Sequence, residues 1–231
     1  MLLANIIPDF VLEELKRTSK YSENHDEVAV IFASIANWGE IYEEAYQGGQ
    51  EFLRLLHEIL SDFDGLLDRP EFNQVEKIKT IGSTYMAAAG LNPERRDAAA
   101  DPHSHLTQLL EFGAALQQVI RRFNDDTMSF VMNFRFQLKI GFNIGPITAG
   151  VIGTTKLYYD IWGDTVNIAS RMYSTGIVDR IQLPETVAAR FSDRFEFDNR
   201  TLKEIKGIDG GMYTVLFKGW KPGVTPYYNL D

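Results

Sequence analysis

VEKIKTIGSTYMAAAGL, residues 75–91, decides how this chain folds. Its first half, residues 75–81, alternates polar and apolar side chains, which is typical of a β-strand with one buried face. Gly82 and Ser83 then form a turn, and the second half returns as a more apolar strand over 84–91. The stretch therefore predicts a β-hairpin.

The sequence on either side of the hairpin supplies two more strands and two helices. An amphipathic helix is expected over 48–66, after an apolar, buried strand, EVAVIFASIA, over 27–36. A second helix is expected over 105–123, followed by an alternating strand, FRFQLKIGFN, over 134–143. This order is the ferredoxin-like βαββαβ pattern of an α+β fold, with an antiparallel sheet. In that topology the first strand ends beside the hairpin turn.

The remaining segments divide the chain into three predicted parts. Residues 1–26 form a helical lead-in, residues 27–217 form the main domain, and the Pro- and Gly-rich residues 218–231 form a tail. The polar residues 92–104 are predicted to be a mobile loop, and a short helix is expected at about 184–191.

Composition narrows the classes of function. With 231 residues, of which 45% are hydrophobic, the chain can bury a sizeable core. The net charge of −9 and the lack of a basic stripe argue against nucleic-acid binding. The chain has no cysteine, which excludes disulfides and thiolate–metal sites. No apolar run reaches the roughly 18–20 residues that cross a bilayer, so the sequence predicts a soluble, cytosolic chain.

YYDIWGDTVNIASR, residues 158–171, carries the most chemistry. It predicts a short strand, a tight turn and a helix with Asp164 as its N-cap. Asn167 and Arg171 are four residues apart and share a helical face, and Asp160 lies on the strand just before. A carboxylate, an amide and a guanidinium are useful groups for the base, ribose and phosphate of a nucleotide. An ordinary strand–helix corner with a solvated Arg fits the same spacing.

Four stretches together resemble one family. FASIANW, EKIKTIGSTYMAAAGL, LKIGFNIGPITAGVIG and YDIWGDTVNIASRM are similar to the second cytoplasmic catalytic domain of membrane adenylyl cyclases, which are class III nucleotidyl cyclases. The similarity runs from about residue 27 to about residue 217, and TTKLYYDIWGDTVNIASRM is most similar to the type nine isoform. The resemblance implies a head-to-tail heterodimer with a first catalytic domain. ATP binds between the two domains and is converted to cyclic AMP and pyrophosphate.

The resemblance also implies roles for individual residues. Lys79 matches the residue that reaches a ring nitrogen of adenine, Asp160 matches the acceptor of the adenine 6-amino group, and Ile161 would lie against the base. Asn167 matches the residue that positions the ribose. Arg171 matches the residue that stabilises charge on the α-phosphate.

The phosphate and metal positions depart from the family pattern. Lys206, in EIKG, matches a lysine that holds the terminal phosphates, but Ile208 and Asp209 stand where the family usually continues with Lys–Gly. Ser34 and Ser83 match the two Asp that hold two Mg²⁺ ions in the first domain. Since Ser is a weak, neutral ligand for a hard dication, the resemblance implies no metal site in this chain and both Mg²⁺ ions on the partner domain.

A stimulatory G-protein α subunit is another partner that the resemblance implies. In the family it docks in a groove between the helix at about 46–56 and the loop at about 124–135. Tyr46, Phe130 and Met132 would suit such a groove, and simple core or rim packing is the alternative explanation for them.

Forskolin and self-association complete the expected ligands and partners. Leu53 and Ser83 agree with the forskolin-responsive pattern, whereas Gly39 does not, so we expect weak binding at best. The parent protein would lie at the cytoplasmic face of the plasma membrane. Two alternatives stay open: a regulatory, self-associating domain without turnover, and a homodimeric cyclase.

Overall fold

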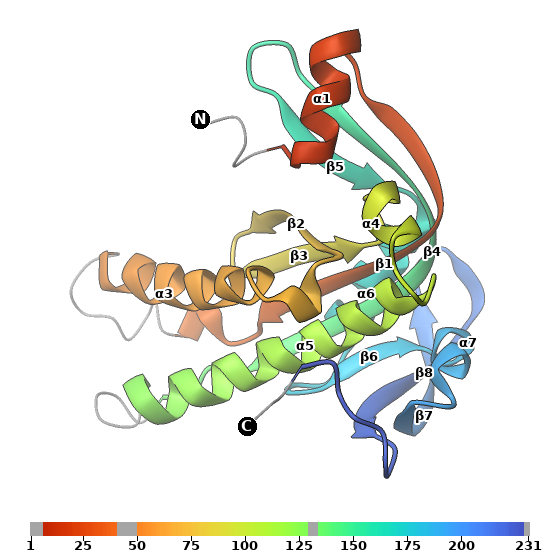
Figure 1. The fold of residues 1–231 in the computed structure, drawn as a ribbon. Helices are drawn as coiled ribbons and strands as arrows, with labels where there is room; N and C mark the ends of the chain where they lie inside the picture. The colour runs from red at the N-terminus through yellow and green to blue at the C-terminus, as the bar shows by residue number, and fades with distance from the viewer. Residues whose placement is uncertain (1–6, 41–49, 129–133, 229–231) are drawn as a thin grey trace.

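The computed structural model describes residues 7–40, 50–128 and 134–228, which form a curved eight-stranded sheet with helices on both faces (Figure 1). The strands are β1 (Ser22–Ile35), β2 (Val75–Ile81), β3 (Thr84–Ala89), β4 (Leu138–Ile152), β5 (Tyr158–Trp162), β6 (Ile181–Pro184), β7 (Phe195–Ile205) and β8 (Ile208–Trp220). The helices are α1 (Asp9–Thr18), α3 (Gln50–Leu67), α4 (Pro93–Asp97), α5 (Ser104–Phe123), α6 (Asp164–Ser174) and α7 (Glu185–Ala188). Shorter helical turns are η2 (Pro70–Phe72), η3 (Asn124–Met128) and η4 (Ala189–Phe191).

The predicted ferredoxin-like core is confirmed. The sheet runs in the order β2-β3-β1-β4-β6-β8-β7, and β5 pairs with β4 beside this path. Its first four strands are antiparallel, and α3 and α5 provide the two helical connections. The end of β1 lies beside the β2–β3 turn, as expected, because Ser34 pairs with Thr84 and Ile35 N donates to Ser83 O at 3.1 Å.

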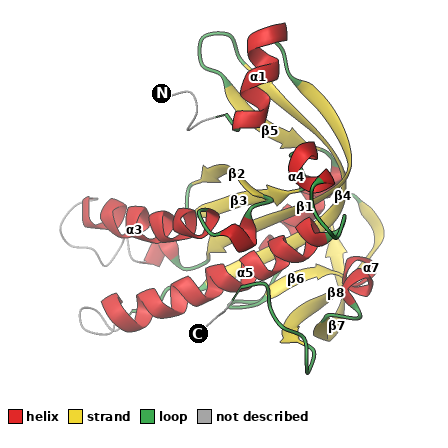
Figure 2. Cartoon of the chain, viewed as in Figure 1, coloured by secondary structure: helices red, strands yellow, loops and turns green. Residues whose placement is uncertain are grey.

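Each face of the sheet has its own buried core. On one face, α3 and α5 cover apolar side chains of β1, β3 and β4, and Figure 2 shows these two long helices side by side in front of the sheet. On the other face, α1, β5 and α6 enclose a second, smaller cluster. The predicted nucleotide-binding residues of β2, β5 and α6 belong to this second face.

The strand predicted at 134–143 is displaced, since β4 begins at Leu138 and continues to Ile152. The residues just before β4 bond to asparagine side chains instead of to a strand. Phe136 N donates to Asn124 Oδ1 at 2.7 Å, and Gln137 N donates to Asn37 Oδ1 at 3.0 Å. The strand's extension pairs with β5, so β4 and β5 form a long hairpin.

Two further local predictions are wrong. The loop predicted over 92–104 contains α4, whose N-cap Asn92 accepts a hydrogen bond from Arg95 N at 3.2 Å. Asp164 is not the N-cap of α6, because Gly163 takes that place with φ 137°. Asp164 is instead the first residue of the helix, where its negative charge still favours the helix dipole.

The predicted tail is packed against the domain over its described part. Strand β8 continues to Trp220, and the side chain of Tyr228 is buried. The backbone N–H groups of Tyr227 and Tyr228 donate to the buried carboxylate of Glu111 on α5, at 2.6 and 3.3 Å. None of the described helices is both long and apolar enough to span a membrane.

Candidate functional site

Lys79 and Asp160, which are 81 residues apart in the sequence, meet on the second face of the sheet. The Lys79 ammonium donates to Asp160 Oδ2, which links the edge strand β2 to β5. The Asp160 side chain is almost fully buried, whereas that of Lys79 is partly exposed. A partly exposed hydrogen-bond donor therefore lies beside an almost fully buried acceptor.

The other oxygen of Asp160 is held by the backbone. Asp160 Oδ1 accepts a hydrogen bond from Ile161 N at 2.9 Å, so only Oδ2 faces Lys79. The Ile161 side chain is 2% exposed and belongs to the second core cluster. In the chain by itself, Ile161 offers a ligand almost no surface.

Asn167 and Arg171 lie on the exposed side of α6, as their spacing predicts. Neither side chain makes a hydrogen bond or an ion pair within the part of the chain that the structure describes. The helix is fixed to β4 by two bonds, from Thr165 Oγ1 to Pro146 O at 2.7 Å and from Asn143 Nδ2 to Thr165 O at 3.1 Å. The fixed helix thus presents an unpaired amide and an unpaired guanidinium.

Gly141 of β4 allows α6 to lie this close to the sheet. A Cβ atom at this position would come within 2.1 Å of Tyr173 N and 2.3 Å of Ala169 O. Any side chain there would push α6 outward, together with Asn167 and Arg171.

Lys206 lies apart from the other predicted residues. It occupies the tip of the β7–β8 hairpin, where Ile205 pairs with Ile208 and Gly207 takes a positive φ of 89°. Its side chain is exposed and contacts none of the other predicted site residues through a hydrogen bond or ion pair in the described ranges.

The two serines at the family's metal positions bond within the protein. Ser34 Oγ accepts from Thr84 Oγ1 at 2.8 Å, and Ser83 Oγ lies 3.4 Å from Ile35 O, to which it donates. Across the described residues there is no group of three or more His, Cys, Asp or Glu able to hold a metal ion. The hydroxyls of Ser34 and Ser83 therefore do not fit a Mg²⁺ site at these two positions.

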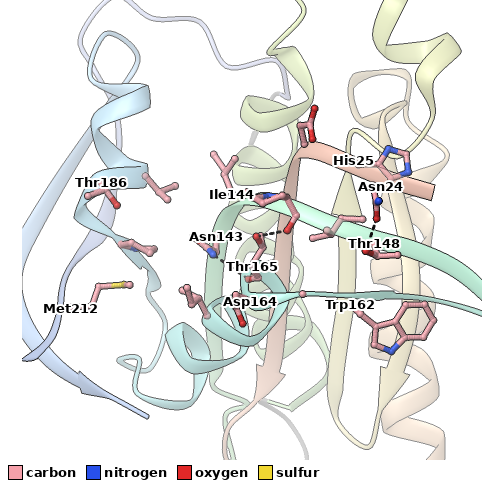
Figure 3. Close-up of a pocket in the computed structure, with 18 residues that line it drawn as sticks. Asn24, His25, Asn143, Ile144, Thr148, Trp162, Asp164, Thr165, Thr186 and Met212 are labelled. Atoms are coloured by element: carbon pink, nitrogen blue, oxygen red, sulfur yellow. Dashed lines mark hydrogen bonds between the residues drawn. The ribbon is translucent and has the colours of Figure 1, made fainter. Parts of the chain in front are cut away.

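A cavity of about 710 Å³ lies next to this site and shares α6 with it. Figure 3 shows Asn143, Asp164 and Thr165 in its middle, between Thr186 and Met212 on one side and Trp162 on the other. No motif in the sequence predicted this cavity. It is lined by none of the six predicted site residues; of these, Lys79, Asn167 and Arg171 have side chains that reach the surface outside it. An open face is the expected geometry where a second domain completes the site.

These features define a nucleotidyl cyclase fold, and the sequence identifies its family. Residues 20–219 match the family described as "Adenylate and Guanylate cyclase catalytic domain", so the chain belongs to that family. Adenylate cyclase type 9 from Xenopus laevis is 50% identical over 99% of this chain, and the chicken protein of that name is 50% identical over 98% of it. The chain spans 17% of the length of each. The resemblance to the type nine isoform is thus confirmed.

Solved structures agree with the fold. The guanylate cyclase domain of RhGC from Catenaria anguillulae, in complex with GTP, superposes with a TM-score of 0.72 at 27% identity and covers 86% of this chain and 100% of that one. The adenylyl cyclase CyaB from P. aeruginosa reaches a TM-score of 0.77 at 16% identity, over 89% of this chain and all of its own, and shows the fold alone. Catalytic domains of this family form dimers, bind nucleotide and generally use Mg²⁺ or Mn²⁺.

Proposed function

We propose that this chain is one half of an adenylyl cyclase active site, completed by a first catalytic domain. In the reaction, the 3′-oxygen of ATP attacks the α-phosphorus, a new P–O bond closes the cyclic AMP ring, and pyrophosphate leaves. The observation that carries the proposal is the meeting of Lys79 and Asp160 on the open face next to α6. Homology to adenylate cyclase type 9 supports the choice of reaction.

Hydrogen-bond polarity supports ATP as the substrate. Adenine has an acceptor at position 1 and a donor at its 6-amino group, whereas guanine has the reverse. Lys79 donates to the ring nitrogen and Asp160 Oδ2 accepts from the amino group once the base enters between them. Ile161, which is 2% exposed in the chain by itself, would lie against the base from the strand that carries Asp160.

The remaining residues act on the ribose and phosphates. Asn167 orients the ribose, and Arg171, four residues along α6, stabilises the negative charge that develops on the α-phosphate. An unpaired guanidinium aimed at developing charge is the arrangement that lowers a barrier most effectively, because it needs no reorganisation. Lys206 holds the terminal phosphates from the hairpin tip.

We assign both Mg²⁺ ions to the partner domain. Ser34 and Ser83 offer neutral hydroxyls that already bond to Thr84 and to Ile35 O, and hard dications prefer carboxylates. The residues of this chain therefore bind the base, ribose and phosphates and do not ligate the metal ions.

An apolar strip on the β4–β5 hairpin supports pairing with a second domain. Ile152, Tyr158 and Trp162 are 47%, 48% and 37% exposed, and the strand register puts all three on one face of the hairpin. The same strip would serve self-association, the alternative in which the chain binds ligands without turnover.

The other proposed partners have less direct support. A stimulatory G-protein α subunit would bind as in the family, but Tyr46, Phe130 and Met132 lie outside the described residues. Weak forskolin binding would use Leu53, which is 62% exposed on α3, and Ser83, which is partly exposed at the hairpin turn. The parent protein would place this domain at the cytoplasmic face of the plasma membrane.

Mixing this chain with a separate first catalytic domain tests whether it is one half of an active site. The purified chain, a separate first catalytic domain and their mixture are each incubated with Mg²⁺-ATP, and cyclic AMP is measured by mass spectrometry. We expect product only from the mixture. Robust turnover by this chain alone, rising with its concentration, would favour the homodimeric cyclase, and none in any mixture would favour the non-catalytic domain.

The choice of base is tested by reversing its hydrogen-bond polarity. Lys79→Glu combined with Asp160→Ser should shift the assembled enzyme from ATP toward GTP, because each mismatched buried contact costs roughly 1–3 kcal/mol. An ATP:GTP ratio of kcat/KM that stays at the wild-type value would remove Lys79 and Asp160 from base recognition.

A further inference from the structure

Lys77 and Lys79 are two positions apart on β2, yet their side chains point to opposite faces of the sheet. On a regular strand, residues i and i+2 face the same way. Here the pairing of β2 with β3 shifts by one residue, so that Lys77 lies opposite Ala87 and Lys79 opposite Met86. Ile78 is the extra residue, which makes this a β-bulge.

Contacts on the two faces confirm the reversal. Ala87 belongs to the core cluster under α3 and α5, and on that side Lys77 Nζ donates to Asp64 Oδ2 of α3 at 2.6 Å. Met86 belongs to the second cluster, and on that side Lys79 donates to Asp160. The bulge therefore decides which lysine of β2 reaches the candidate site.

Asp64 fastens β2 immediately before the bulge. Its Oδ1 accepts from the hydroxyl of Tyr85 at 2.8 Å, and the Tyr85 side chain is fully buried in β3. Lys77 Nζ also lies 5.1 Å from the centre of the Tyr85 ring. One carboxylate thus joins the helix, the edge strand and the strand beside it.

The edge position of β2 makes this fastening matter. In the described sheet β2 has a neighbouring strand only on the β3 side. Its other side borders a groove of about 730 Å³, whose lining includes Asp64, Lys77, Ile78 and Lys79. A strand paired on one side has fewer backbone hydrogen bonds to fix its position than a strand paired on both sides.

We propose that Asp64 is a positioning residue for base recognition, acting through Lys77 and the Ile78 bulge to aim Lys79 at Asp160. The claim that Lys79 recognises a base rests on the function proposed above. The claim that Asp64 keeps Lys79 in contact with Asp160 does not depend on that function. Without Asp64, Lys77 loses its partner, the bulge is free to move along β2, and Lys79 spends part of its time away from Asp160.

The test measures the reactivity of Lys79 in the purified chain. Each variant is treated with a trace of acetic anhydride, and acetylation of Lys79 is quantified by mass spectrometry against Lys16. An ammonium held against a carboxylate is shielded, so Asp64→Asn should raise Lys79 labelling by roughly two- to fivefold, the range expected for a partly exposed ion pair. Lys77→Met should do the same, whereas Lys77→Arg should restore the wild-type value.

Two variants calibrate this measurement. Asp160→Asn breaks the pair directly and should give the largest increase. Asp62→Asn, an exposed acid on the same helix with no hydrogen bond in the described ranges, should give none. Equal labelling in Asp64→Asn and Asp62→Asn, or an unchanged value in Asp160→Asn, would overturn the proposal. Circular dichroism and thermal melting confirm that each variant is folded.

Kinetics in the mixture with a first catalytic domain give the second readout. Asp64→Asn should raise KM for ATP roughly two- to fivefold with kcat within about twofold, and should lower the ATP:GTP preference, because it disturbs binding of the base rather than the transition state. A fall in kcat with KM unchanged would contradict the positioning role. If no mixture turns over, the proposed function fails while the labelling result still decides the aiming of Lys79.

Discussion

At the residue scale, the pairing of Lys79 with Asp160 could be anticipated from the sequence, whereas the contact of Lys77 with Asp64 on the opposite face could not. The resemblance to adenylyl cyclases predicted Lys79 and Asp160 as partners of one base, and the structure brings them into contact. Nothing in the spacing of VEKIKTI indicated that Lys77 and Lys79 would face opposite ways, because alternation predicts the same face for both. The bulge depends on the pairing with β3, which a single strand's pattern does not contain.

Arg171 should affect the rate of the reaction more than the binding of substrate. Its guanidinium has no partner in the described structure, so its charge is available to the α-phosphate. We expect Arg171→Ala, assayed with a first catalytic domain, to lower kcat by ~10²-fold with little change in KM, as for other interactions made mainly in the transition state. Arg17→Ala, an exposed arginine on α1, is the control. A change confined to KM would make Arg171 a ground-state phosphate clamp.

At the element scale, α5 shows where helix prediction succeeds and where it stops. Its apolar spacing predicted the helix over 105–123, and the structure has it over Ser104–Phe123. The same pattern does not explain why two of the buried polar side chains of this helix, His105 and Glu111, have 0% exposure. Their partners are Glu27 O and the backbone of Tyr227 and Tyr228, which are far away in the sequence.

Glu111 should hold the last described segment in place. Its carboxylate accepts from Trp220 Nε1 at 2.9 Å as well as from the two tyrosine N–H groups. Glu111→Ala leaves these three donors, and the Arg194 guanidinium 3.4 Å from Glu111 Oε1, without their acceptor, so we expect a loss of about 2–4 kcal/mol in the free energy of unfolding. Urea melts measure the loss, and limited proteolysis should show faster cleavage between 221 and 228. Glu204→Ala, at an exposed position, serves as the control. An equal loss of stability in both variants would contradict the proposed role of Glu111 in holding this segment.

Buried histidines should make the fold sensitive to acid. Burial lowers the pKa of His105 and of His25 from the ordinary 6.5, so both take up a proton less readily in the folded chain than in the unfolded chain. As the pH falls below about 6.5, the unfolded chain binds protons that the folded chain does not, and the free energy of unfolding decreases. We expect the melting temperature to drop between about pH 7 and pH 5.5.

Replacement of one histidine isolates its contribution. His105→Gln keeps a donor for Glu27 O and should flatten the pH dependence, by up to about 1.4 kcal/mol per pH unit for one group. His57→Gln, an exposed histidine on α3, should keep the wild-type slope. Identical slopes in both variants would show that His105 does not cause the acid sensitivity.

At the scale of the whole molecule, the proposed function makes this chain one partner of a two-domain enzyme. The order of strands and helices could be read from hydrophobic periodicity, because each core segment is long and regular. The open face with Lys79, Asp160, Asn167 and Arg171 could not be read that way, since it depends on β5 and α6 packing against one side of a curved sheet. Under this proposal the partner domain also supplies the metal ligands, because Ser34 and Ser83 place hydroxyls where the family resemblance implies carboxylates.

Restoring those carboxylates should change what the chain can do alone. Ser34 and Ser83 lie at the neighbouring ends of β1 and the β2–β3 turn, where Thr84 already donates to Ser34. Carboxylate oxygens from two adjacent strand ends are suitable ligands for Mn²⁺ or Mg²⁺. Ser34→Asp combined with Ser83→Asp should therefore bind Mn²⁺, measured by calorimetry, and should yield metal-dependent cyclic AMP where the wild-type chain alone yields a negligible amount.

The control for this variant carries the same added charge elsewhere. Ser22→Asp with Ser61→Asp places two carboxylates at exposed positions on β1 and α3, away from the hairpin turn. If both double variants bind Mn²⁺ equally weakly, position is irrelevant and the two serines do not mark a lost metal site. If only Ser34→Asp/Ser83→Asp binds the ion but turnover stays absent, two copies of this chain do not align an adenine pocket with a metal site. If Ser34→Asp/Ser83→Asp produces cyclic AMP without a first catalytic domain and the control variant does not, then the two serines are the reason why two copies of this chain lack activity.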